Sequence, residues 1–131
     1  MMNRQLALRS AGILAILTAL YHAISGDAIL RELEISPTNQ MDFVRSTHQL
    51  GSMGWLAGGV LLIVAASLDS QQARNWIIGV FAVVYGLPAF GTLALSGGEI
   101  SIGGVALALV VVLALVGRRG GPMVTEAKTV A

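Results

Sequence analysis

The sequence contains no cysteine and few charged residues. The absence of cysteine in all 131 residues excludes disulfides, zinc–thiolate centres, iron–sulfur clusters and thiol redox chemistry. Charged residues make up only 11% of the chain, against about 25% in soluble domains. The net charge is +1, and no cluster of Lys and Arg is present that could follow a phosphate backbone. We therefore expect no nucleic-acid partner.

Apolar residues dominate what remains. They make up 55% of the chain, and a small soluble domain could not bury so much apolar surface. Each span of a bilayer needs about 20 mostly apolar residues, which form a helix because lipid offers the backbone no hydrogen bonds. Four segments fit this requirement: 10–26, 47–68, 76–95 and 100–117. The sequence predicts an all-α, four-helix transmembrane bundle over residues 1–119 and a flexible cytoplasmic tail over 120–131.

The connections and the basic residues predict the topology. The last two connections are short, which favours antiparallel neighbours in an up-down-up-down order. With both termini in the cytoplasm, six of the eight basic residues lie inside, in agreement with the positive-inside rule. The predicted location is therefore the inner (plasma) membrane of a bacterial-type cell. Arg4 and Arg9 before an apolar run are also typical of a signal peptide, but three further apolar segments favour a retained first helix.

The connection over residues 26–46 is the one long enough for structure of its own. Asp27 to Glu34 has the apolar pattern of a short helix on the membrane surface. Ser36-Pro37 is typical of a helix start, with serine as the N-cap and proline at the first helical position.

Small residues predict where the helices touch, because lipid supplies no hydrophobic drive and close contact depends on van der Waals packing. The first segment carries alanines at four-residue spacing, and each later segment carries a pair of small residues with the same spacing. We predict that these are packing faces within the chain; the alternative is a homodimer seam at the second segment. The residues are Ala11, Ala15, Ala19 and Ala23, then Gly54/Gly58, Ala82/Gly86 and Gly104/Ala108.

Polar side chains gather at the outer ends of the predicted spans, where each is a candidate site because burial in lipid is costly. His22 lies about one turn from the end of the first segment, and His48 about one turn inside the second. Helical rise then places them at similar depth, within about 6 Å of the outer boundary. With Arg45, Tyr85 and Glu99 they predict a polar pocket near the outer surface.

Four interpretations of this pocket are open. It could bind a lipophilic molecule such as a lipid or quinone, or hold haem or a metal between His22 and His48, with Asp27 or Glu99 completing a metal site. The histidines could act in acid–base catalysis. They could also be structural, each bonded to a carbonyl or neighbour. No GxSxG, P-loop, HExxH or dinucleotide motif is present.

The leading hypothesis is a non-catalytic accessory subunit or hydrophobic-ligand binder, with the bilayer, a lipophilic small molecule and a membrane-protein partner or second copy as partners. The alternative is a small membrane enzyme acting on a lipophilic substrate.

A family resemblance points the same way. The first apolar segment ends in Gly26-Asp27, an amphipathic connector follows, and the second segment opens with Arg45-Ser-Thr-His-Gln-Leu-Gly51. Over residues 5–118 the chain resembles the small four-helix bacterial membrane proteins of the DoxX-like and related families. The resemblance implies an accessory role, in some cases linked to quinones or redox complexes, and transfers no catalytic residue.

Overall fold

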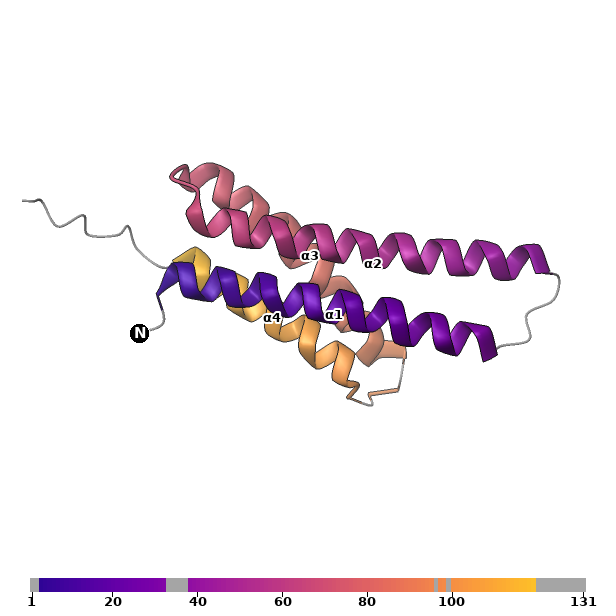
Figure 1. The fold of residues 1–131 in the computed structure, drawn as a ribbon. Helices are drawn as coiled ribbons and strands as arrows, with labels where there is room; N and C mark the ends of the chain where they lie inside the picture. Colours follow the sequence, from indigo (N-terminus) through magenta and orange to yellow (C-terminus); the bar gives the residue numbers. More distant parts are fainter. Residues whose placement is uncertain (1–2, 33–37, 96, 99, 120–131) are drawn as a thin grey trace, which may run out of the picture.

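The computed structural model describes residues 3–32, 38–95, 97–98 and 100–119, and these form four α-helices with no strand among them (Figure 1). Helix α1 spans Arg4–Glu32 and α2 spans Thr38–Ser67. Helix α3 spans Gln71–Leu95, and α4 spans Ile102–Arg119. Each helix contains most of one predicted apolar segment. The predicted tail over 120–131 lies outside the described residues.

Three helices are long and apolar enough to cross a membrane: α1, residues 40–67 of α2, and α3. Helix α4 is equally apolar in character but shorter. It begins at Ile102 because Ser101 caps it, accepting a hydrogen bond from the Gly104 backbone N–H at 3.0 Å. The chain therefore has the composition and helix lengths of a membrane protein.

The first connection differs from its prediction. Residues 27–32 continue α1 without a break, so they are not a separate surface helix. The Arg31 side chain lies one turn beyond Asp27 and donates a hydrogen bond to its carboxylate at 2.8 Å, which supports the continuous helix. The helix start predicted at Ser36-Pro37 lies outside the described residues, and α2 begins at Thr38.

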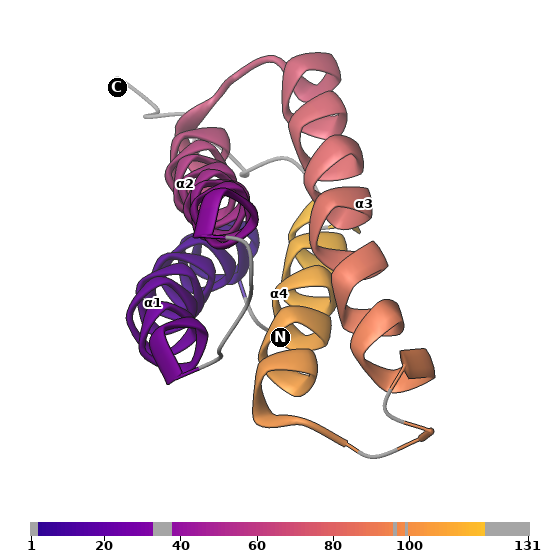
Figure 2. The same cartoon turned by 90° about the vertical axis from the view of Figure 1, so that its right-hand side faces the viewer.

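The helices pack in a defined order. Helix α1 makes its most extensive contact with α2 and its next with α4, whereas α3 packs on α4 and more lightly on α2 (Figure 2). The buried core draws on all four helices. Its members are Leu8, Ala11, Ala15, Leu62, Ala65, Ala66, Ile78, Tyr85, Leu107, Val110 and Ala114. Most of these residues lie in the half of the bundle that holds Arg4, Arg74 and Arg118, called here the Arg118 end. The opposite half, which holds Asp27 and Arg45, is called the Asp27 end.

A direct backbone contact between α1 and α2 is made by glycines outside the predicted pairs. A Cβ added to Gly59 would lie 2.8 Å from the backbone oxygen of Gly12, and one added to Gly12 would lie 2.5 Å from the oxygen of Gly59. The backbones of α1 and α2 therefore touch at this crossing. Of the predicted pair on α2, Gly58 faces Phe81 and Tyr85 of α3, whereas nothing lies within 4 Å of a Cβ at Gly54.

Candidate functional site at the Asp27 end

The structure brings the two histidines together, one from α1 and one from α2. The ring centroids of His22 and His48 lie 4.3 Å apart, with 43° between the ring planes. The ring of Trp55 packs on His22 as well, with its centroid at 4.8 Å. All three rings are partly buried, so they form one aromatic cluster between the two helices.

The His48 side chain of α2 is hydrogen-bonded to the backbone of α1. Nε2 of His48 lies 3.0 Å from the carbonyl oxygen of His22. A carbonyl only accepts, so Nε2 carries a proton and donates it. Gln49, the next residue, donates to the carbonyl of Ala23 at 3.4 Å. Two successive side chains of α2 therefore bind two successive carbonyls of α1.

Gly26 makes this contact sterically possible. The three atoms nearest to a Cβ placed on Gly26 all belong to the His48 ring, and they would overlap it. The ring thus occupies the space that a side chain at position 26 would fill. The sequence indicated Gly26 only as the end of an apolar segment, because nothing local marks which face of α1 meets α2.

Tyr85 lies in the buried core of the bundle and does not line a pocket at its surface. It is 1% exposed, and its hydroxyl donates a hydrogen bond to the backbone oxygen of Trp55 at 2.6 Å. Its ring also contacts Phe81, with centroids 5.9 Å apart. Tyr85 therefore joins α3 to α2 and reaches the histidines only through Trp55. Glu99, the last of the predicted site residues, lies outside the described residues.

Removing the Tyr85 hydroxyl tests this link. We expect Tyr85→Phe to lower the free energy of unfolding in detergent by about 1 kcal/mol, the usual worth of one hydrogen bond. Tyr21→Phe is the matched control, because Tyr21 is 66% exposed. Thermal unfolding followed by circular dichroism measures both variants. Equal stability of the Tyr85 variant and the wild type would contradict a structural role for this bond.

Arg45 takes part in an ion-pair cluster that the sequence did not indicate. Its guanidinium reaches Oδ1 of Asp27 at 2.8 Å, while Arg31 reaches Oδ2 of the same carboxylate at 2.8 Å. Hydrogen bonds from Arg45 and then Arg31 lower the pKa of the Asp27 carboxyl, which lies beyond the apolar segment 10–26. The sequence indicated Asp27 only as the start of a short surface helix or as a metal ligand. Its true partner lies 18 residues away, on the next helix.

A cavity of about 470 Å³ opens beside this cluster. It is lined by Asp27, Asp42, Arg45, Ser46 and Gln49. Of the four predicted pocket residues that the structure describes, Arg45 alone lines it, although His48 lies between Arg45 and Gln49 on the same stretch of α2. The cavity is called here the Asp27 cavity.

The arrangement does not fit a haem or metal site. Two imidazole rings in direct contact leave no space for a macrocycle between them. In the part of the chain that the structure describes, no group of three or more His, Asp or Glu side chains gathers where it could hold a metal ion. The predicted carboxylate ligand Asp27 is already engaged by two arginines.

Comparison with known proteins adds no constraint. No protein-family model, curated protein or solved structure is significantly similar to this chain. The resemblance to DoxX-like proteins therefore stays a prediction, and the function has to be argued from the geometry.

Proposed function

We propose that the chain is a multi-pass protein of a bacterial-type inner membrane, with four spans in up-down-up-down order and both termini in the cytoplasm. Three helices of sufficient length and hydropathy support this. Helix α4 supports it too, because 18 residues rise about 27 Å, close to the roughly 30 Å hydrocarbon thickness. The Asp27 end then faces outward and the Arg118 end faces the cytoplasm, as the distribution of basic residues favours.

We infer that the protein binds a lipophilic molecule with a polar head group, of the lipid or quinone class, at the Asp27 end. The observation that carries this is the Asp27 cavity. Its volume of about 470 Å³ is in the usual range for small-molecule sites. Exposed apolar side chains lie on the same two helix segments, including Ile24, Phe43 and Leu50. A ligand with a polar head and an apolar body would meet both kinds of surface.

Binding is better supported than catalysis. A general base needs a free nitrogen within hydrogen-bond reach of its substrate. Nε2 of His48 is held by the His22 carbonyl, and the His22 ring packs against His48 and Trp55, so these contacts fix the orientation of both rings. Neither histidine lines the Asp27 cavity. Their contacts are those expected of histidines that hold α1 and α2 in register beside a binding site.

Two arginines that share one carboxylate allow a matched test. We expect Arg45→Gln to weaken binding of decylubiquinone or dioleoyl phosphatidylethanolamine about tenfold, because Arg45 lines the cavity and a charge-assisted hydrogen bond is worth about 1.5–3 kcal/mol. Arg31→Gln removes the same charge and also breaks a pair with Asp27, but Arg31 does not line the cavity. Its affinity should stay within about twofold of wild type.

Titration of the purified protein in detergent, followed by native mass spectrometry, measures both affinities. The proposal fails if neither probe binds to the wild type, or if both variants bind as tightly as the wild type does.

A further inference from the structure

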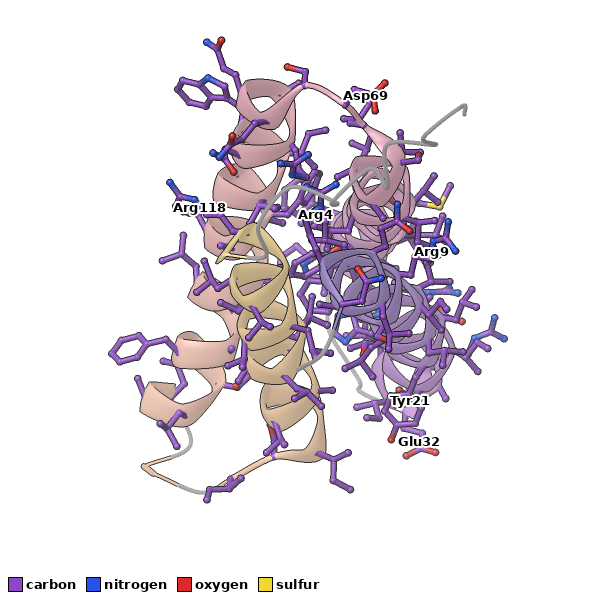
Figure 3. All side chains as sticks on the ribbon, turned by 90° about the vertical axis from the view of Figure 1, so that its left-hand side faces the viewer. Arg4, Arg9, Tyr21, Glu32, Asp69 and Arg118 are labelled. Carbon is purple, nitrogen blue, oxygen red and sulfur yellow. The ribbon has the colours of Figure 1, made fainter. Side chains whose placement is uncertain are left out.

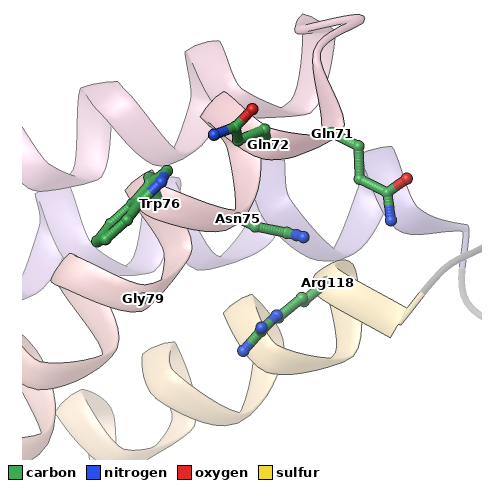
Figure 4. A pocket seen from close by; sticks show the side chains of 6 residues that line it. All are labelled: Gln71, Gln72, Asn75, Trp76, Gly79 and Arg118. Carbon is green, nitrogen blue, oxygen red and sulfur yellow. The ribbon is translucent and has the colours of Figure 1, made fainter.

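A second cavity lies at the opposite end of the molecule, between the start of α3 and the end of α4. Its volume is about 650 Å³, and it is lined by Gln71, Gln72, Asn75, Trp76, Gly79 and Arg118. Figure 4 shows Gln71 and Asn75 on the first turns of α3 and, across the gap, Arg118, whose side chain runs back along the last turns of α4. It is called here the Arg118 cavity, and the proposed function makes no use of it.

The only charged side chain among the described residues of its lining is a cation. Arg118 brings a full positive charge, and three carboxamides bring N–H groups from the first turns of α3. The oxygen of Asn75 is buried without a partner, and Figure 4 shows the nitrogen at the end of this side chain directed toward the gap. Ser70 caps α3 by accepting the Ala73 backbone N–H at 3.3 Å, and the helix dipole is positive at this end. Such a lining suits an anion.

Two further arginines lie at this end of the bundle, and neither takes part in an ion pair with a described residue. Arg74 is 4% exposed, and Arg4 lies close enough to repel it. Their Nε atoms are both buried without a hydrogen-bond partner. Figure 3 shows Arg4 at the centre of this end and Arg118 at its edge. Both ion pairs found within the described ranges involve Asp27, at the opposite end. An anion bound here would offset this repulsion.

The position of the cavity favours a phosphate group attached to a lipid. Trp76 is 69% exposed, as expected of a tryptophan at a membrane interface. No atom lies within 4 Å of a Cβ at Gly79, one turn further along α3, so the cavity opens along that helix. Exposed Val80, Val83 and Leu87 follow. A phosphate at Arg118 would therefore have its acyl chains beside an apolar helix face.

The charged residues that line each cavity indicate which class of lipid head group it would bind. Among the described residues that line the Arg118 cavity there is no carboxylate to pair with the ammonium of a zwitterionic head group. The Asp27 cavity, by contrast, has Asp27 and Asp42 in its lining. We propose that the Arg118 cavity binds the phosphate of an anionic phospholipid, such as phosphatidylglycerol, from the leaflet at that end of the bundle.

Native mass spectrometry of the full chain tests this with dioleoyl phosphatidylglycerol and the phosphatidylcholine of the same chains. We expect the wild type to bind phosphatidylglycerol at least tenfold more tightly. Arg118→Gln should abolish this preference, because one charge-assisted hydrogen bond is worth about a factor of ten or more. Arg9→Gln is the control for charge alone. Arg9 lies at the same end but on the far side of the bundle from Arg118 (Figure 3), and it does not line the cavity.

Three results would overturn the proposal. One is equal affinity of the wild type for the two lipids. Another is an equal loss in the Arg9 and Arg118 variants, which would indicate diffuse attraction in place of a site. The third is displacement of the lipid by millimolar inorganic phosphate, which would make soluble phosphate the ligand. The decylubiquinone titration of the Arg118 variant keeps this test separate from the Asp27 cavity, because its affinity for that probe should be unchanged.

Discussion

Gly59→Leu should destabilise the bundle by about 3 kcal/mol, toward the upper end of the usual cost of overpacking. A Cβ at position 59 would lie 2.8 Å from both the Gly12 oxygen and Cγ1 of Ile16, and 3.1 Å from the Ile16 backbone nitrogen. Two of these atoms belong to the α1 backbone, so no side-chain rotation relieves the contact. The helices would have to separate, and that would loosen the Leu8, Ala11, Ala15 and Leu62 core beside the crossing.

Gly54→Leu is the matched control, because it makes the same change on the same helix where nothing lies within 4 Å. Its thermal unfolding in detergent should match the wild type or improve slightly, since leucine favours a helix over glycine. The two variants also separate the alternatives for the Gly54/Gly58 pair. If Gly54→Leu lowers stability as much as Gly59→Leu does, or changes the oligomeric state in size-exclusion chromatography, the pair is a seam between copies.

Hydropathy and helical rise predict much of this fold. The lengths of the apolar runs indicate four helices, and all four are present. The buried residues Ala11, Ala15 and Ala19 follow the predicted ridge on α1. Hydropathy does not predict the point at which α1 and α2 cross, because that point depends on the angle between the two helices. Gly58 and Gly59 are neighbours in sequence, yet about 100° of rotation turns one toward α3 and the other toward α1. A search for four-residue spacing therefore indicates Gly58 and misses the contact between Gly12 and Gly59.

The same distinction applies to the site. Residue number predicts that His22 and His48 lie at similar depth, and their rings touch because both also lie on the faces where α1 and α2 meet. Residue number does not predict which side chains on different helices bind each other. The pair between Asp27 and Arg45 depends on α1 continuing as a helix past Gly26, where sequence analysis had placed a separate element. Tyr85 was predicted to line the outer pocket, but the rotation of α3 directs its hydroxyl to the Trp55 backbone.

Gly26→Ala should release His48 from the α1 backbone. The added methyl would overlap the His48 ring, so the side chain has to turn away and its bond to the His22 carbonyl is lost. A side chain moves more easily than a helix, so we expect a cost of about 2 kcal/mol, less than at Gly59. Decylubiquinone binding should weaken as well, because His48 lies between Arg45 and Gln49, which line the Asp27 cavity.

A double-mutant cycle separates this contact from a general intolerance of alanine at position 26. In a His48→Ala background the obstructing ring is gone, so Gly26→Ala should be neutral or slightly stabilising, as alanine is in a helix. The two changes would then be non-additive by at least about 1 kcal/mol, which is well above the scatter of independent sites. Gly51→Ala, where nothing lies within 4 Å, should show no such coupling to His48→Ala. Additive effects of Gly26→Ala and His48→Ala would mean that the ring does not occupy this space, and the proposed role of His48 in holding α1 and α2 in register would be wrong.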